Sequence, residues 1–311
     1  PTAYRLLLLL AFWTLCGGWH FYSTDLNARV HWEPEHCQIP YFIDIAGIDD
    51  LEGDTEFQII HDAFQVWNDA ECTPLEFQFV DYLAEPEMTV DFRNTVIFVS
   101  EGWTALADGM DKPPAGGVSK SWAAFTLITY DTQTGMLTDA DLMVNLELFD
   151  FSDCEDDAEG DRYDFFYTVL HEVGHMVGLD HSDDPFSIMQ PAAQTCDNDP
   201  PHLLTNDDLG GLCWFYGNQD WMEACEAASP REPWLDGPAA AESQPEIVAA
   251  DASDETSGME ELGPEMAEPP APDCCCTVLD SPAVPGGIPL LLLAFFAIFF
   301  MIRKLGELKL R

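Results

Sequence analysis

The stretch from His171 to Ser182, HEVGHMVGLDHS, constrains this chain more than any other feature. His171 and His175 are four residues apart, so on a helix both side chains lie on one face and can reach the same metal ion. Gly178 can end that helix and turn the chain, which would bring His181 back as a third nitrogen ligand. Three protein ligands with a fourth position open to water are typical of a catalytic Zn²⁺ site.

Glu172 stands between the two helical histidines, where its carboxylate could accept a proton from the attacking water. It is therefore the candidate catalytic residue. HExxH alone arises often by chance, whereas the full pattern with Gly178 and His181 does not. A pair of helix histidines that hold no metal is the weaker alternative.

The full pattern HExxHxxGxxH resembles the signature of the metzincin zinc metalloproteases. The longer form HExGHxxGLDHS is similar to that of the matrixins, in which Asp180 and Ser182 would flank the third ligand. Residues 187–191, SIMQP, resemble the tight turn that places a methionine beneath the zinc. The resemblance therefore implies that Met189 supports the site.

This resemblance covers about residues 31 to 217, most strongly from 163 onward. It implies an α+β fold, a metzincin-like catalytic domain. Its parts would be a twisted, mainly parallel five-stranded sheet with an antiparallel edge strand, an active-site helix and a C-terminal helix. Asp207 and Asp208 in that last helix would brace the methionine turn or the chain terminus. Substrate would lie extended along the edge strand, for which Ser121 to Ile128 is the candidate by analogy with the fold.

The activity that the resemblance implies is hydrolysis of peptide bonds in protein substrates by a zinc-dependent endopeptidase. A non-catalytic, surface-displayed module that binds zinc or protein is the alternative, although Glu172 and all three histidines are present. The family's short inhibitory peptide around a cysteine is missing. Residues 83–162 hold no histidine, so the family's second, structural zinc is not expected, and one catalytic zinc is.

Hydrophobic periodicity predicts the elements that would hold this site. Five strands are expected at 39–45, 75–82, 95–100, 123–130 and 137–148. Three helices are expected: about 55–70 with Asp54 as its cap, one with a stripe of Phe166, Leu170, Val173 and Val177 around the histidines, and 204–216 starting at Thr205 or Asn206.

Acidic residues dominate the charge: 57 Asp and Glu face 11 Lys and Arg, for a net charge of −46 at pH 7. Such a charge disfavours nucleic acid and anionic lipid as partners. It suits a solvated surface, and some carboxylates could hold Ca²⁺, although no segment has the EF-hand spacing. We expect a monomer that acts on a protein or peptide substrate.

The N-terminal residues predict export. Residues 1–18, with Arg5, an apolar run and small residues at the end, are typical of a secretory signal peptide, so the catalytic domain would span 19–217. Cys16 raises the alternative of a lipoprotein signal, which the large Leu15 before it disfavours.

The C-terminal third predicts attachment to the cell surface. Residues 218–236 form a short Cys/Trp appendage, and 237–273 have the composition of a disordered, acidic, Pro/Ala-rich stalk. Residues 274–311 hold a cysteine cluster, an apolar segment and a basic tail, similar to the bacterial sorting signals called MYXO-CTERM. The alternative is a plain transmembrane anchor. Before any processing, the chain would contact the membrane here. The mature protein would be outside the cell or associated with its outer membrane.

Ten cysteines in an exported chain predict disulfides. The candidates in or beside the folded part allow several pairings: Cys37, Cys72, Cys154, Cys196, Cys213 and Cys225. Cys37 with Cys72 is the preferred pair, because the two bracket the first predicted strand and helix. Cys37 could instead block the zinc, which is the weaker alternative.

Overall fold

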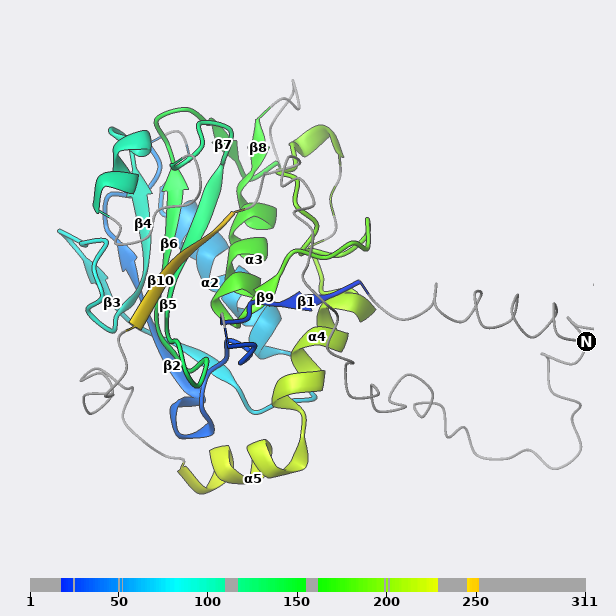
Figure 1. Ribbon diagram of the computed structural model, residues 1–311. Coiled ribbons are helices and arrows are strands. Elements are labelled where there is room, and N and C mark those ends of the chain that lie inside the picture. Colours follow the sequence, from blue (N-terminus) through cyan, green and yellow to red (C-terminus); the bar gives the residue numbers. More distant parts are fainter. Residues whose placement is uncertain are drawn as a thin grey trace, which may run out of the picture. The chain divides into compact units, whose positions relative to one another are not determined.

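The computed structural model describes residues 18–228, apart from 25, 50, 52, 110–116, 155–161, 199 and 201, and the backbone of 245–251. The strands of the central sheet are β2 (Gln38–Asp44), β3 (Glu76–Leu83), β4 (Asn94–Val99), β5 (Ala124–Asp131), β6 (Leu137–Asn145) and β10 (Pro245–Asp251). Their order is β10-β5-β6-β4-β2-β3 (Figure 1). Strands β3, β2, β4 and β6 run parallel, whereas β5 is antiparallel to both β6 and β10.

The sheet agrees with the predicted α+β class, since four parallel strands are flanked by the antiparallel β5. All five strands expected from the sequence are present, with ends that differ by up to three residues. The strand β10 is not expected, because its composition belongs to the acidic stretch 237–273. Strand β10 forms because its backbone N–H and C=O groups pair with those of β5.

Two helices cover one face of the sheet: α2 (Thr55–Asn68) and α3 (Phe165–Met176). They pack against each other, and α3 also contacts β5 and β6 (Figure 1). The buried indole of Trp67 on α2 donates a hydrogen bond of 2.9 Å to the carbonyl of Leu170 on α3. Asp164 caps α3 through its side chain, whereas Asp54 stands at the start of α2 without a capping bond. The start of the histidine-bearing helix is thereby fixed.

A second apolar cluster covers the opposite face of the sheet. Strands β4, β5 and β6 contribute Val99, Phe125 and Met143 to this cluster. The long connection before β5 adds Trp103 and Trp122, which pack onto them. Trp103 begins the short helix η2 (Trp103–Gly109). Strand β5 is therefore buried on both faces. One backbone edge of β5 pairs with β6 and the other with β10.

Disulfides connect the start of the domain to the helices α4 (Asn206–Tyr216) and α5 (Gln219–Ala228). The predicted pair of Cys37 with Cys72 is wrong: Cys37 pairs with Cys225 on α5, and Cys72 pairs with Cys213 on α4. The reason is that α4 and α5 return to the end of the sheet where β2 begins and α2 stops. A chain-entropy estimate gives about 5 kcal/mol for each of these long-range crosslinks. The bond to Cys225 also rules out Cys37 as a zinc ligand.

The remaining described elements are short. They are β1 (His20–Phe21), η1 (Pro34–His36), β7 (Phe151–Ser152), β8 (Tyr163–Asp164), β9 (Leu179–Asp180) and η3 (Cys196–Asn198), and a third disulfide joins Cys154 to Cys196. Residues 1–17 of the predicted signal peptide 1–18 and the tail 274–311 lie outside the described residues. No helix among the described residues is long and apolar enough to cross a membrane.

Candidate metal centre

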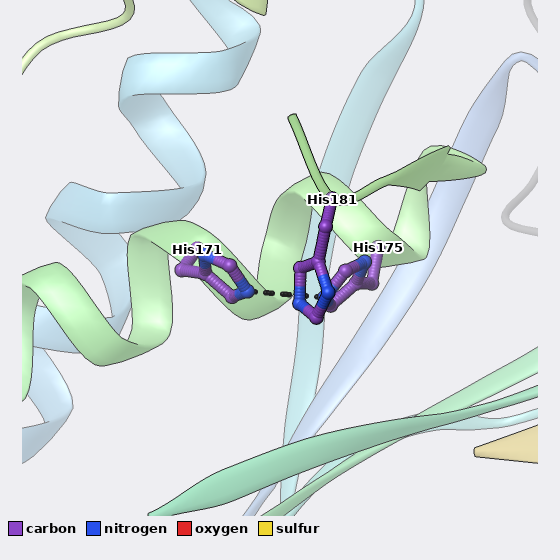
Figure 2. A group of neighbouring side chains, drawn as sticks. All are labelled: His171, His175 and His181. Atoms are coloured by element: carbon purple, nitrogen blue, oxygen red, sulfur yellow. Dashed lines mark hydrogen bonds between the residues drawn. The ribbon is translucent and has the colours of Figure 1, made fainter. Parts of the chain in front are cut away.

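Three histidine side chains converge beside α3 (Figure 2). His171 and His175 come from successive turns of α3, and His181 comes from the chain just after β9. One ring nitrogen from each histidine lies within 4.8 Å of the other two. In the part of the chain that the structure describes, no other group of three His, Cys or carboxylate side chains is placed to share an ion.

Backbone carbonyls fix the tautomers of the two helical histidines. Nδ1 of His171 donates to the Ile188 carbonyl at 2.7 Å, and Nδ1 of His175 donates to the Leu179 carbonyl at 2.8 Å. Each Nε2 therefore carries a lone pair. The two Nε2 atoms face each other at 3.0 Å, an arrangement that a cation between them would stabilise. Tetrahedral Zn²⁺ with bonds of about 2.1 Å would place its ligand nitrogens about 3.4 Å apart, so this donor set fits zinc.

Both helical histidines are held in the neutral form. Burial, and after it the neighbouring His181 ring, lowers the pKa of His171 to about 3. Burial and the two other rings keep the pKa of His175 well below its ordinary value of 6.5. A neutral imidazole is the form that binds a metal, so near pH 7 these ligands need not lose a charge first.

Glu172 follows His171 on α3 and is completely buried. Its carboxylate Oε2 accepts a hydrogen bond of 2.7 Å from the hydroxyl of Thr126, a fully buried residue of β5. This hydrogen bond connects Glu172, the candidate base, to β5, the strand that is expected to align the substrate. Thr126 was not expected at the site from the sequence. Its signal is a polar residue among the apolar ones of a buried strand.

Gly178 sets the turn that returns His181 to the site. Its φ is 91°, and a Cβ at this position would meet the carbonyl oxygen of Val30. Both constraints favour glycine. The chain then continues through β9, where the Asp180 carboxylate accepts a hydrogen bond of 2.7 Å from the amide of His181. Asp180 therefore orients the backbone that carries the third ligand.

The predicted methionine turn packs directly against α3. The Ile188 carbonyl accepts hydrogen bonds from both His171 and the hydroxyl of Tyr167. Met189 is buried, and a Cβ on Gly174 of α3 would meet its sulfur. The turn is thus connected to one zinc ligand by a hydrogen bond and to the helix by close packing.

Asp207 and Asp208, which are adjacent on α4, hold two different segments near the histidines. Asp208 accepts from the hydroxyl of Ser187 in the methionine turn, and it closes the capping box of α4 with Thr205. Asp207 accepts from the hydroxyl of Ser182, next to the third ligand. Asp207 also accepts from the backbone of residue 18.

The described N-terminal segment also borders the site, which was not expected from the sequence. Strand β1 pairs antiparallel with β9, and Trp19 and Phe21 pack against Trp214 of α4. The hydroxyl of Tyr22 lies 3.4 Å from Nδ1 of His175. No motif marks these residues, so only the tertiary structure reveals their place.

Comparisons with known proteins agree with this geometry. The family model described as Matrixin matches residues 31–217. Matrix metalloproteinase-16 of Homo sapiens is 32% identical over 189 residues, which are 60% of this chain and 28% of that protein. Matrilysin of Rattus norvegicus is 36% identical over 72 residues, 23% of this chain and 27% of that protein. A putative matrix metalloproteinase of Heliothis virescens ascovirus 3e is 33% identical over 129 residues, 41% of this chain and 23% of that protein. The matches thus span roughly a quarter of each relative.

Proposed function

The chain belongs to the matrixin family of zinc endopeptidases, and from this premise we propose that it is an exported enzyme that cleaves extended segments of protein substrates. The observation that carries the proposal is the convergence of His171, His175 and His181 next to a buried carboxylate, that of Glu172. Metal ligands and a candidate general base are thereby combined on α3 and the turn that follows it.

Each residue of this site has a separate role in the proposed reaction. Bound Zn²⁺ would supply a Lewis acid that activates water and polarises the substrate carbonyl. Glu172 accepts the proton of the attacking water and delivers it to the leaving amine. Thr126 orients the Glu172 carboxylate through its hydroxyl, at 2.7 Å. Met189 supports His171 through its turn, in which the neighbouring Ile188 carbonyl accepts a hydrogen bond from His171.

A group of surrounding side chains keeps the third ligand and the methionine turn in place. Asp180 bonds the amide of His181, and Ser182 bonds Asp207. Asp208 holds the turn through Ser187. Removal of hydrogen-bond partners of this kind typically lowers metal affinity or activity by about 10- to 100-fold.

A substrate would lie as an extended strand along β5 and add backbone hydrogen bonds to the sheet. The expected stretch 121–128 overlaps the first half of β5, which begins at Ala124. Because the Thr126 side chain contacts Glu172, a peptide at the outer edge of β5 would pass beside the base. The substrate that we propose is therefore an extended segment of a protein.

Export is supported by the three disulfides, which form and persist in oxidising compartments. Residues 1–18 would direct the export, and 19–217 would be the catalytic domain. Residues 218–236 and 237–273 would connect it to the segment 274–311, which would serve as a sorting signal or an anchor. In this proposal the enzyme works as a monomer at the cell surface or outside the cell.

The test is cleavage of a quenched mixed-peptide library by the zinc-loaded protein, with metal content measured in parallel. Glu172→Ala should keep about one zinc per chain and lose at least about 10²-fold in kcat/KM. His181→Ala should weaken zinc binding. Glu71→Ala is the matched control, because this exposed glutamate lies outside the site.

Each result separates one part of the proposal from the others. Turnover retained in Glu172→Ala would contradict the role of general base. Unchanged zinc affinity in His181→Ala would contradict the third ligand. Zinc bound at one per chain without any cleavage would instead favour a non-catalytic binding module.

A further inference from the structure

The outer edge of β5 is the surface on which this inference depends. Strand β6 occupies one backbone edge of β5, and α3 and the second apolar cluster cover its faces. A peptide that adds a strand beside the base must therefore use the other edge. In the described structure that edge is paired with β10, from the chain's own acidic segment (Figure 1).

The pairing of β10 with β5 is continuous and antiparallel. It runs from Pro245 opposite Asp131 to Asp251 opposite Phe125 without a shift in register. Ala250 lies opposite Thr126, whose hydroxyl bonds the Glu172 carboxylate. The backbone of β10 thus uses the same donors and acceptors, next to the base, that an extended substrate would need.

We propose that residues 245–251 are a tethered occupant of the substrate edge, which competes with substrate and lowers the activity of the enzyme until the segment leaves β5. The proposal rests on the proposed function and adds its regulation. Residues 229–244 connect β10 to α5, so the segment remains in the same molecule at an effective concentration in about the millimolar range. A protein substrate must compete with this segment for the edge.

Two consecutive prolines within β10 test the proposal in the full chain loaded with zinc. Neighbouring N–H groups of a strand point in opposite directions, so either Val248→Pro or Ala249→Pro removes a donor that faces β5. The double variant should therefore lose the pairing. Met266→Pro with Ala267→Pro is the matched control, because it adds two prolines outside β10.

The first readout is kinetic. We expect kcat/KM for a quenched peptide to rise roughly tenfold in the 248/249 variant, mainly through KM, because a tethered competitor has been removed. The 266/267 control should match the unsubstituted chain. A synthetic peptide of residues 245–251 should inhibit the 248/249 variant competitively. Equal kcat/KM in both variants, in an active enzyme, would overturn the proposal.

The second readout does not require activity. Hydrogen exchange of the β5 amides that face away from β6 should be slow in the unsubstituted chain and the control, and faster in the 248/249 variant. Unchanged exchange would overturn the proposal even if the protein cleaves peptides. If every variant binds zinc but none cleaves, the proposed function fails, whereas the exchange result still decides whether β10 occupies the edge.

Discussion

Replacing Thr126 by valine should impair catalysis while leaving the fold and the zinc in place. Valine has nearly the shape of threonine but lacks the hydroxyl that bonds Glu172 Oε2 at 2.7 Å. Both residues are fully buried, so water does not replace the lost donor. A hydrogen bond to a charged group contributes about 1.5–3 kcal/mol. Since 1.36 kcal/mol corresponds to about tenfold in rate, the expected loss in kcat/KM is roughly 10- to 150-fold.

The assay is the pH dependence of kcat/KM, with zinc content and Tm measured on the same preparations. The ionised carboxylate loses a donor, so the acidic limb of the profile should move to higher pH in Thr126→Val. Thr126→Ser keeps the hydroxyl and should retain most of the activity. Thr129→Val makes the same change three residues along β5, on the opposite face of the strand, and should leave the profile unchanged.

A zinc-loaded Thr126→Val enzyme with kcat/KM within about twofold of the original and the same pH profile would refute this reasoning. The hydrogen bond to Glu172 would then have no part in orienting the base. Loss of zinc or a large fall in Tm would instead assign Thr126 a structural role. The two results are distinguishable because all three quantities are measured together.

Three further predictions concern the frame of the site. Gly174→Ala should lower the free energy of unfolding by about 1–3 kcal/mol in chemical denaturation, because its Cβ would meet Met189 and Trp67, and a helix-propensity gain of about 1 kcal/mol does not offset this. Asp208→Asn should weaken zinc binding by about 10- to 100-fold in a chelator competition, because Ser187 loses a charged acceptor; unchanged affinity would separate the methionine turn from the metal. Burial and the charge of Asp139 raise the pKa of Asp141 well above its ordinary value of 3.8. The native state then keeps a proton that the unfolded chain releases, so this contribution to stability is present below pH of about 4 and is lost as pH rises through the native pKa. Asp141→Asn should therefore gain Tm relative to the original protein at pH 8 but not at pH 4, and parallel Tm–pH curves would contradict the assignment.

The sequence predicts the parts of this protein that depend on local spacing. His171 and His175 are one helical turn apart, and Gly178 must turn the chain, so the triad follows from residue order alone. The five expected strands follow from β-forming residues and turn signals. Strand ends and the cap of α2 are less well predicted, because the tertiary contacts of each end decide them.

Features that depend on contacts between distant residues are not predictable in this way. The choice of Cys225 and Cys213 as disulfide partners depends on where α4 and α5 lie, and the linear order of the cysteines does not contain that information. The same holds for Thr126, whose importance arises from the position of α3 above β5. Composition correctly describes the acidic stretch as poor in apolar residues, but a strand needs only a free edge with which to pair.

Two of these unpredicted features lie on strand β5: the contact of Thr126 with Glu172 and the pairing with β10. The side chain of Thr126 points from this strand to the base, while the backbone at the same residue pairs with neighbours on both edges. Any peptide that replaces β10 must therefore bind within one residue of the group that orients Glu172. Changes in occupancy of the edge and changes in the setting of the base would then occur together. For that reason the loss of the Thr126 hydroxyl should alter KM and kcat jointly, whereas a substitution confined to β10 should act mainly on KM.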